Sequence, residues 1–308
     1  MKIAFLNLCH CDPDVVARVA NKLTVNENFH MYIHVDAKST IDKFEEKLKD
    51  NPRIVFIKER FKIYWGGFHA IRATLQLLKE ALESKEEYDY FVILQNLDYP
   101  IKSNTYIEQF FERNNGKEFI RGCNIAKTKD WHFSRKYKIY NKRDDDFYLS
   151  NPSKIRKALR YASLRLRSIA TISFNGVIKE KEETFPLYYG AAQWAITREC
   201  ARYIIDFAST HNRFNNVMKH IQFPDEEYFH TIVHNSPFKE QCIIYDEPIK
   251  RWLVNWRNLH YFEYPKEITV FTEKDFNKIM MQEDLFCRKV KTDQSEKLMD
   301  LIDLATTD

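Results

Sequence analysis

No long apolar run occurs in this sequence. Across its 308 residues no stretch approaches the roughly 18 consecutive apolar side chains of a membrane span, and the opening MKIAFLNL turns polar at CHCDPD. The apolar part of a signal peptide is also longer than this opening. We therefore expect a soluble, cytoplasmic chain without an export signal.

Glycine is scarce, with 6 residues in the whole chain, and no segment has low complexity. This composition argues against a linker-rich or disordered protein. The hydrophobic content of 44% is enough to bury a sizeable core, and we predict a single domain over residues 1–308. Neither G-x-G-x-x-G nor a P-loop lysine motif is present, so a standard dinucleotide or P-loop site is not expected.

Strong charge and paired cysteines are also missing. The net charge of +4 is too small to indicate nucleic-acid binding. The six cysteines are scattered, which favours buried free thiols in a reducing compartment over a disulfide framework. Cys9, His10 and Cys11 lie together, but a C-x-C without a second pair is a weak metal motif.

Short apolar runs alternate with helix-like segments through the first hundred residues. Strands are predicted at 2–8, 30–36, 53–59 and 88–100, and helices at 13–23, 41–50 and 68–82. This alternation predicts an α/β fold with a mostly parallel, Rossmann-like sheet covered by helices on both faces. Ligands bind beyond the carboxyl ends of such strands, which points to His10, 34–38, 64–67 and 96–98 as a nucleotide site.

Residues 151–170 contain six Lys or Arg and no acid. On a helix, an apolar stripe from Ile155 to Ile169 would be bordered by these cations. Such a helix can lie on an anionic membrane, or it can dock on the protein with its charges in water. The sequence leaves both possibilities open.

Three consecutive acids follow Pro224, and they have two interpretations. Acids in a first helical turn are favoured by the helix dipole, so Asp225, Glu226 and Glu227 can be a simple helix start. Alternatively, one carboxylate is a general base toward an acceptor hydroxyl. A competing hypothesis is a zinc site formed by Glu226, His230 and His234, which would lie on one helix face at i, i+4 and i+8.

A basic pair, Arg288-Lys289, follows an apolar turn near the C-terminus. The pair can be a solvated surface feature. It can also neutralise a diphosphate, with Arg making bidentate contacts and Lys acting as a point charge.

Six motifs occur in one order along the chain, and together they resemble the branching-enzyme family of glycosyltransferases, which includes core-2 and I-branching β-1,6-N-acetylglucosaminyltransferases and protein xylosyltransferases. The motifs are IHVDAKS (33–39), YWGGFHAI (64–71), LQNLDYPIKSN (94–104), FPLYYGAAQWAITREC (185–200), PDEEYFHTIVHNS (224–236) and LFCRKV (285–290). KRWLVNWRN (250–258) matches the family only loosely.

The resemblance implies a GT-A-type fold, a UDP-sugar donor and inversion at the anomeric carbon. It also implies a nucleotide-binding half at about 1–120 and an acceptor-binding, catalytic half at about 121–308. Family members lack a working D-x-D metal site, and here the corresponding strand end reads Asn96-Leu97-Asp98. One carboxylate is a poor cradle for Mg²⁺ or Mn²⁺, so we expect no metal cofactor.

The resemblance also assigns roles to residues. The general base maps onto Glu226, and the basic residue at the leaving diphosphate onto Lys289, with Arg288 beside it. The other donor-binding positions are His34, Asp36, Lys38, Trp65, Gly66, Asp98 and Arg251. The acceptor-binding positions are Gln193, Trp194, Asp225 and Trp256.

Members of the family are Golgi-type, membrane-anchored and rich in disulfides, whereas this chain shows neither an anchor nor a disulfide framework. A bacterial-type enzyme of surface-polysaccharide synthesis fits better, with a glycan acceptor that is carried on a lipid. The basic segment 151–170 would then contact the inner face of the membrane. Two other classes are left open: a zinc-dependent hydrolase using Glu226, His230 and His234, and a non-catalytic protein that binds sugar or docks on membranes.

Overall fold

The computed structural model describes residues 1–126, 128–141, 144, 162, 175–244, 257–264 and 266–308. The strands are β1 (Ile3–Cys9), β2 (Phe29–Val35), β3 (Ile54–Phe56), β4 (Tyr90–Gln95), β5 (Asp98–Pro100), β6 (Glu118–Asn124), β7 (Val177–Glu180), β8 (Glu183–Pro186), β9 (Tyr188–Tyr189), β10 (Ala195–Thr197), β11 (Cys242–Ile244), β12 (His260–Phe262) and β13 (Phe286–Arg288). The α-helices are α1 (Pro13–Leu23), α2 (Asp42–Leu48), α3 (His69–Leu82), α4 (Asn104–Arg113), α5 (Trp131–Lys138), α8 (Arg198–Thr210), α9 (Asn212–Met218), α10 (Tyr228–His234), α11 (Phe276–Met280) and α12 (Thr292–Ala305). Short 3₁₀ turns are η1 (Pro224–Glu226), η2 (Pro237–Gln241) and η4 (Glu273–Asp275).

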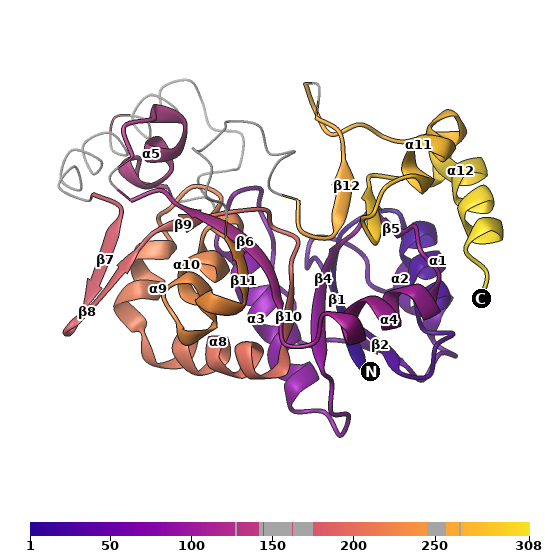
Figure 1. Cartoon of the computed structure of the whole chain (residues 1–308), viewed down its shortest axis with the longest axis horizontal. Coiled ribbons are helices and arrows are strands. Elements are labelled where there is room, and N and C mark those ends of the chain that lie inside the picture. The colour runs from indigo at the N-terminus through magenta and orange to yellow at the C-terminus, as the bar shows by residue number, and fades with distance from the viewer. Residues whose placement is uncertain (127, 142–143, 145–161, 163–174, 245–256, 265) are drawn as a thin grey trace.

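An eight-stranded sheet forms the centre of the molecule (Figure 1). Its strand order is β11-β6-β10-β4-β1-β2-β3, and β9 pairs with β6. The pairs β4-β1, β1-β2 and β2-β3 are parallel, whereas β10 is antiparallel to both of its neighbours. The α/β fold with a mostly parallel sheet is therefore confirmed, and strands from both halves of the chain share this one sheet.

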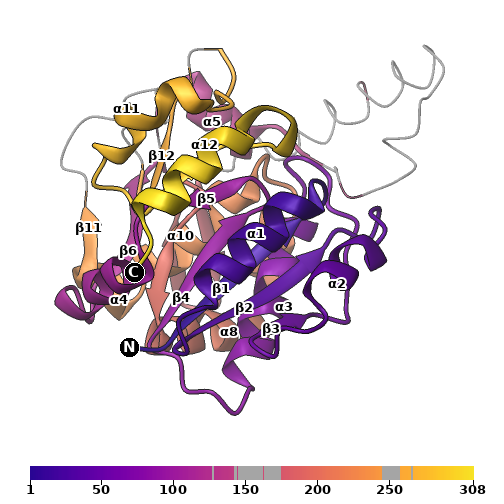
Figure 2. The same cartoon turned by 90° about the vertical axis from the view of Figure 1, so that its right-hand side faces the viewer.

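Helices cover both faces of the sheet, and each face has its own apolar core. On one face α3, α8 and α10 pack against the strands; on the other face α1, α2, α4 and α12 do so (Figure 2). Three of these helices begin at a capping side chain: Asp12, Ser103 and Thr197 accept a hydrogen bond from the first turn of α1, α4 and α8. Strands buried on both faces explain the near-continuous apolar runs of β1 and β4.

A second sheet of three strands, β12-β13-β5, lies beside the central one. Strand β13 is antiparallel to β5, and their register places Arg288 opposite Asp98. The segment 88–100, predicted as one strand, is therefore two: β4 stays in the central sheet, and β5 pairs with the C-terminal region. This small sheet brings Arg288, in the C-terminal part of the chain, to the carboxyl edge of the parallel strands.

The region around the three acids also differs from the sequence prediction. A single helix through Glu226, His230 and His234 was expected, but Glu226 ends the 3₁₀ turn η1 and the two histidines lie on α10. The backbone at Glu227 leaves the helical region, with φ −132°, and separates the two elements. The prediction of one continuous helix face is therefore wrong.

Three predicted features lie largely or wholly outside the described residues: Arg251, Trp256 and, apart from Ala162, the basic segment 151–170. Among the helices that the structure does describe, none combines the length and the apolar character needed to cross a bilayer.

Candidate active site

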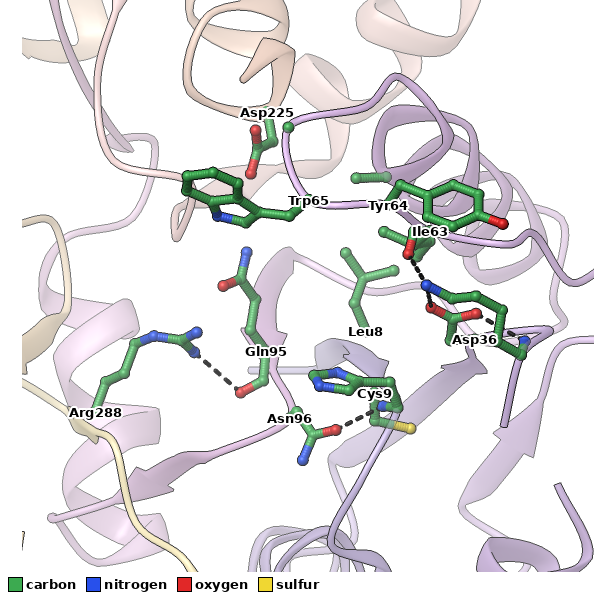
Figure 3. Close-up of a pocket in the computed structure, with 14 residues that line it drawn as sticks. Leu8, Cys9, Asp36, Ile63, Tyr64, Trp65, Gln95, Asn96, Asp225 and Arg288 are labelled. Atoms are coloured by element: carbon green, nitrogen blue, oxygen red, sulfur yellow. Dashed lines mark hydrogen bonds and ion pairs between the residues drawn. The ribbon is translucent and has the colours of Figure 1, made fainter. Parts of the chain in front are cut away.

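A cavity of about 390 Å³ opens at the carboxyl ends of β1, β2 and β4 (Figure 3). This is the edge at which ligands bind in open parallel sheets. The loop after β3, the η1 turn and β13 complete the walls. The cavity is lined by Leu8, Cys9, His10, Asp36, Lys38, Ile63, Tyr64, Trp65, Gly66, Ala70, Gln95, Asn96, Asp225 and Arg288.

Asn96 forms part of the floor and holds the loop after β1. Its Oδ1 accepts hydrogen bonds from the backbone N–H groups of His10 (2.6 Å) and Cys11 (2.8 Å), and its Nδ2 donates to the Cys11 carbonyl (2.7 Å). An ionised Asp can accept but cannot donate, so it would leave the Cys11 carbonyl unpaired. The Asn96 amide is therefore required to hold the loop after β1, because it both donates and accepts hydrogen bonds there.

Asp98 is buried and belongs to an ion pair with Arg288. The Arg288 guanidinium lies 2.6 Å from Asp98 Oδ1, His260 Nε2 lies 3.2 Å from Oδ2, and the Gln95 N–H donates to Oδ2 at 2.7 Å. Burial alone would raise the pKa of Asp98, but the Arg288 charge, His260 and the Gln95 N–H together outweigh it, and the pKa lies below its usual value. Asp98 is thus occupied in orienting Arg288, whose side chain lines the cavity.

Asp36 and Lys38 line the opposite wall, after β2. The Asp36 carboxylate accepts a hydrogen bond from the Lys38 N–H (2.8 Å), which closes a tight turn, and the Lys38 ammonium lies 3.4 Å from the same carboxylate. The ammonium also lies 4.3 Å from the centre of the Tyr64 ring. This wall offers a carboxylate and a cation to a polar ligand, with an aromatic ring beside them.

The loop 64–67 forms the rim of the cavity. Trp65 is 77% exposed, and its ring meets the edge of Phe223 at a centroid distance of 4.4 Å. Gly66 has φ +74°, a backbone conformation that favours glycine, and its carbonyl accepts a hydrogen bond from the Asn141 side chain (3.0 Å). The exposed Trp65 ring therefore lies at the rim of the cavity, on a loop that the Asn141 hydrogen bond fixes.

Asp225 enters the cavity from η1, facing the sheet edge (Figure 3). Its Oδ1 is buried, and no hydrogen-bond partner for it is found among the residues that the structure describes. Burial, followed by the negative charge of Glu226, raises the pKa of Asp225 to about 6. A carboxyl of this kind can bind a ligand hydroxyl and titrates close to neutral pH.

Glu226 and Glu227 lie beside Asp225 but in different surroundings. The side chain of Glu226 is 23% exposed and pairs with the ammonium of Lys136, which belongs to α5. Glu227 is fully buried, and within the described part of the chain neither of its carboxylate oxygens has a hydrogen bond. Burial raises its pKa to about 8. Three consecutive acids thus occupy three environments: the cavity wall, a partly buried ion pair and the core.

The two histidines of the proposed zinc site do not converge with Glu226. His234 Nε2 bonds to the Ile120 carbonyl (2.9 Å), and its ring stacks on Tyr188. His230 is completely buried, and a Cβ added at Gly190 would lie 2.4 Å from its ring. Burial lowers the pKa of both histidines. No group of three metal-binding side chains is found in the part of the chain that the structure describes.

The remaining predicted site residues lie behind or beside the cavity. His34 is buried and accepts a hydrogen bond from the Phe61 N–H (2.9 Å); Trp194 is buried against Phe229 and presents no free face. Gln193 donates to Gln95 Oε1 (2.9 Å) and so supports a lining residue. Lys289 is not among the lining residues, whereas its neighbour Arg288 is.

Sequence reasoning missed Lys136 and Asn141. Lys136 and Asn141 lie in a part of the chain without a strong motif, and only their contacts in the fold reveal them. Tyr64 belongs to the segment 64–67 that was predicted for the ligand-binding edge, and it lines the cavity.

Comparison with known proteins places this geometry in context. Xylosyltransferase oxt of Drosophila pseudoobscura pseudoobscura is 30% identical over 109 residues, which are 35% of this chain and 12% of that protein. Xylosyltransferase sqv-6 of Caenorhabditis elegans is 22% identical over 231 residues, 72% of this chain and 25% of that protein. Xylosyltransferase 2 of Rattus norvegicus is 20% identical over 325 aligned positions, 98% of this chain and 33% of that protein.

The chain thus spans about a third or less of the length of these relatives. The sequence profile of the Core-2/I-Branching enzymes matches residues 3–280, which include every lining residue except Arg288. The chain belongs to the Core-2/I-Branching enzyme family.

Proposed function

We propose that this chain is a glycosyltransferase that moves a sugar from a nucleotide donor to a hydroxyl group of a glycan. One observation carries the proposal. This chain belongs to the family, and its cavity at the carboxyl edge of the parallel strands has the Arg288 cation on one wall and the Asp36 and Asp225 carboxylates on others. A cation suits a diphosphate, and carboxylates suit sugar hydroxyls. The xylosyltransferase relatives are named for the same class of reaction.

For the donor we propose a UDP-sugar. Asp36 and Lys38, on the wall after β2, would bind the nucleoside, while Arg288 would bind the diphosphate, with Lys289 next to it in sequence. The Asp98 contact at 2.6 Å supports this role for Arg288, because a guanidinium fixed before the substrate arrives loses little entropy on binding.

We further propose that transfer needs no divalent metal. Two observations on the residues themselves support this. Asn96 stands where a first metal-binding acid would be, and its amide is engaged with the loop after β1. The Asp98 carboxylate is already paired with Arg288. Side-chain cations would then stabilise the charge that develops on the diphosphate.

In the proposed reaction, Glu226 takes the proton of an acceptor hydroxyl while that oxygen attacks the anomeric carbon of the donor. The new carbon–oxygen bond forms as the bond to the diphosphate breaks, and the bonding electron pair leaves with UDP. A single displacement inverts the anomeric centre, as in inverting glycosidases. Asp225, on the cavity wall, would hold a sugar hydroxyl.

For the acceptor we propose a lipid-carried glycan of a bacterial surface polysaccharide. The composition of residues 151–170, with six cations and no acid, supports contact with an anionic membrane surface.

The test compares Glu226→Gln with Asp225→Asn in a UDP-release assay over a panel of UDP-sugars and glycan acceptors, in EDTA. We expect Glu226→Gln to lower kcat by roughly 10²- to 10⁴-fold and to keep UDP affinity, because only the base is lost. Asp225→Asn should act mainly on KM. Turnover that survives in Glu226→Gln but not in Asp225→Asn would reverse the two roles, and loss of turnover in EDTA would refute the metal-free mechanism.

A further inference from the structure

Lys136 is a buried cation on α5, a helix that contributes no residue to the cavity wall. It is 4% exposed, and its ammonium contacts Glu226 Oε2. The ammonium lies 4.2 Å from the centre of the Tyr189 ring and 5.3 Å from that of Phe223. Burying an ammonium costs free energy unless a charge partner and aromatic rings compensate for the lost water. At Lys136 the compensation comes from Glu226, Tyr189 and Phe223.

The backbone fixes both partners of this ion pair. The Lys136 carbonyl accepts a hydrogen bond from the Gln222 N–H (3.0 Å), which joins α5 to the chain just before η1. The Glu226 carbonyl accepts from the Gly190 N–H (2.9 Å), and the Glu226 N–H donates to the Phe223 carbonyl (3.1 Å). With both main chains held, the ion pair sets the direction of the Glu226 carboxylate. Among the described residues, no hydrogen bond involves its second oxygen, Oε1.

The charges around Glu226 are mostly negative. Among the residues that the structure describes, the groups that face this cluster are Asp225 and Glu227 from the same segment, Lys136 from α5, Tyr189 from β9, Cys123 from β6 and His230 from α10. Burial keeps His230 neutral by lowering its pKa, and it keeps Tyr189 and Cys123 neutral by raising theirs. The positive charge that offsets the acids within this cluster therefore comes from Lys136.

We propose that Lys136 is a positioning residue for Glu226: it anchors Oε2, leaves Oε1 for the acceptor hydroxyl, and supplies a positive charge beside the adjacent carboxylates of Glu226 and Asp225. The proposal rests on Glu226 being the base. In this scheme Lys136 does not touch the substrate. Its contribution is to fix one rotamer of the base and to offset the repulsion between two adjacent carboxylates, which would otherwise keep one of them protonated.

Three substitutions separate position from charge. Lys136→Arg keeps the charge and the donors, Lys136→Gln keeps a donor without charge, and Lys136→Met removes both. Lys138→Met is the matched control, because it removes a partly exposed lysine two residues away on the same helix. The readouts are the pH profile of kcat, the KM for the donor, UDP affinity and the melting temperature.

We expect Lys136→Met to lower kcat by roughly 10- to 100-fold, as misplacement of a catalytic group does, with UDP affinity unchanged. The acidic limb of the pH profile should move to higher pH in Lys136→Met and Lys136→Gln but not in Lys136→Arg. If the methionine variant does not fold, the glutamine variant supplies the same pH comparison. Lys138→Met should match the wild type in every readout.

Two outcomes would overturn the proposal. One is a wild-type kcat and pH profile in Lys136→Met. The other is an equal loss of UDP affinity, stability and activity with an unmoved acidic limb, which a merely structural lysine would give. Glu226→Gln, assayed in parallel, keeps the two hypotheses apart. If it remains active, the base is wrongly assigned; if it is inactive while Lys136→Met is normal, only the role of Lys136 fails.

Discussion

Replacement of Arg288 by Met isolates the buried ion pair at the cavity. In the wild type, Asp98 is 3% exposed and its carboxylate lies 2.6 Å from the Arg288 guanidinium. Removing one partner of a buried pair leaves an uncompensated charge and costs about 3 to 5 kcal/mol. The Gln95 N–H, at 2.7 Å, and His260 Nε2, at 3.2 Å, still contact Asp98 in the variant. We therefore expect the lower end of that range, roughly 3 kcal/mol.

This loss should be visible in thermal unfolding at pH 7. At about 2 to 3 °C per kcal/mol for a chain of this size, the melting temperature of Arg288→Met should fall by roughly 6 to 9 °C. Because Arg288 lowers the folded pKa of Asp98, its stabilisation is present above the usual carboxyl value and is lost as pH falls through the folded pKa. The difference between variant and wild type should therefore shrink in acid.

A second substitution separates stability from binding. Asp98→Asn in the Arg288→Met background removes the stranded charge, so the melting temperature should largely recover. UDP affinity should stay reduced by roughly 10- to 100-fold, the size expected for one lost charge-assisted hydrogen bond. Calorimetric titration with UDP measures this. A wild-type melting temperature in the single variant would refute the buried pair, and full UDP affinity in the double variant would refute the diphosphate role of Arg288.

Two further predictions concern the packing behind the cavity. A Cβ at Gly190 would lie 2.2 Å from the Arg121 carbonyl and 2.4 Å from the His230 ring. Gly190→Ala should therefore lower the free energy of unfolding, measured in urea, by roughly 3 kcal/mol or more. Gly116→Ala is the control: Gly116 has a positive φ but open space around it, and its substitution should cost about 1 kcal/mol. Burial raises the folded pKa of Glu227 to about 8, so the free energy of unfolding of the wild type should fall as pH rises from the usual carboxyl pKa to about 8. Glu227→Gln lacks this titration, and its stability relative to the wild type should therefore increase between pH 5 and pH 9. An identical pH dependence of unfolding in the two proteins would contradict a buried carboxyl with a raised pKa.

Local sequence patterns predicted much of the fold. The elements β1, α1, β2, α2 and α3 lie within a few residues of their predicted bounds, because apolar periodicity and capping residues act over short distances. The cavity edge followed from the same patterns, since polar residues after parallel strands converge at one edge. Asp36, Lys38, Trp65 and Gly66 were predicted for the donor site and line the cavity.

The predictions that depend on side-chain direction were less accurate. His34 follows the strand pattern of the site residues, yet its side chain points into the core, because side chains alternate between the two faces of a strand. Trp194 lies in the family motif 185–200 and was predicted to bind the acceptor, yet its side chain is buried. Which face a residue takes depends on the register and on the packing of elements that are distant in sequence.

The sequence by itself determined the α/β class, the order of the elements, the sheet edge at which the cavity opens and, through six ordered motifs, the family. The tertiary structure alone decided which charges meet. Asp98 and Arg288 are 190 residues apart in the chain, and antiparallel pairing of β5 with β13 joins them. Lys136 and Glu226 are 90 residues apart, and packing of α5 against η1 joins them. Such contacts depend on how whole elements dock, which no local pattern encodes.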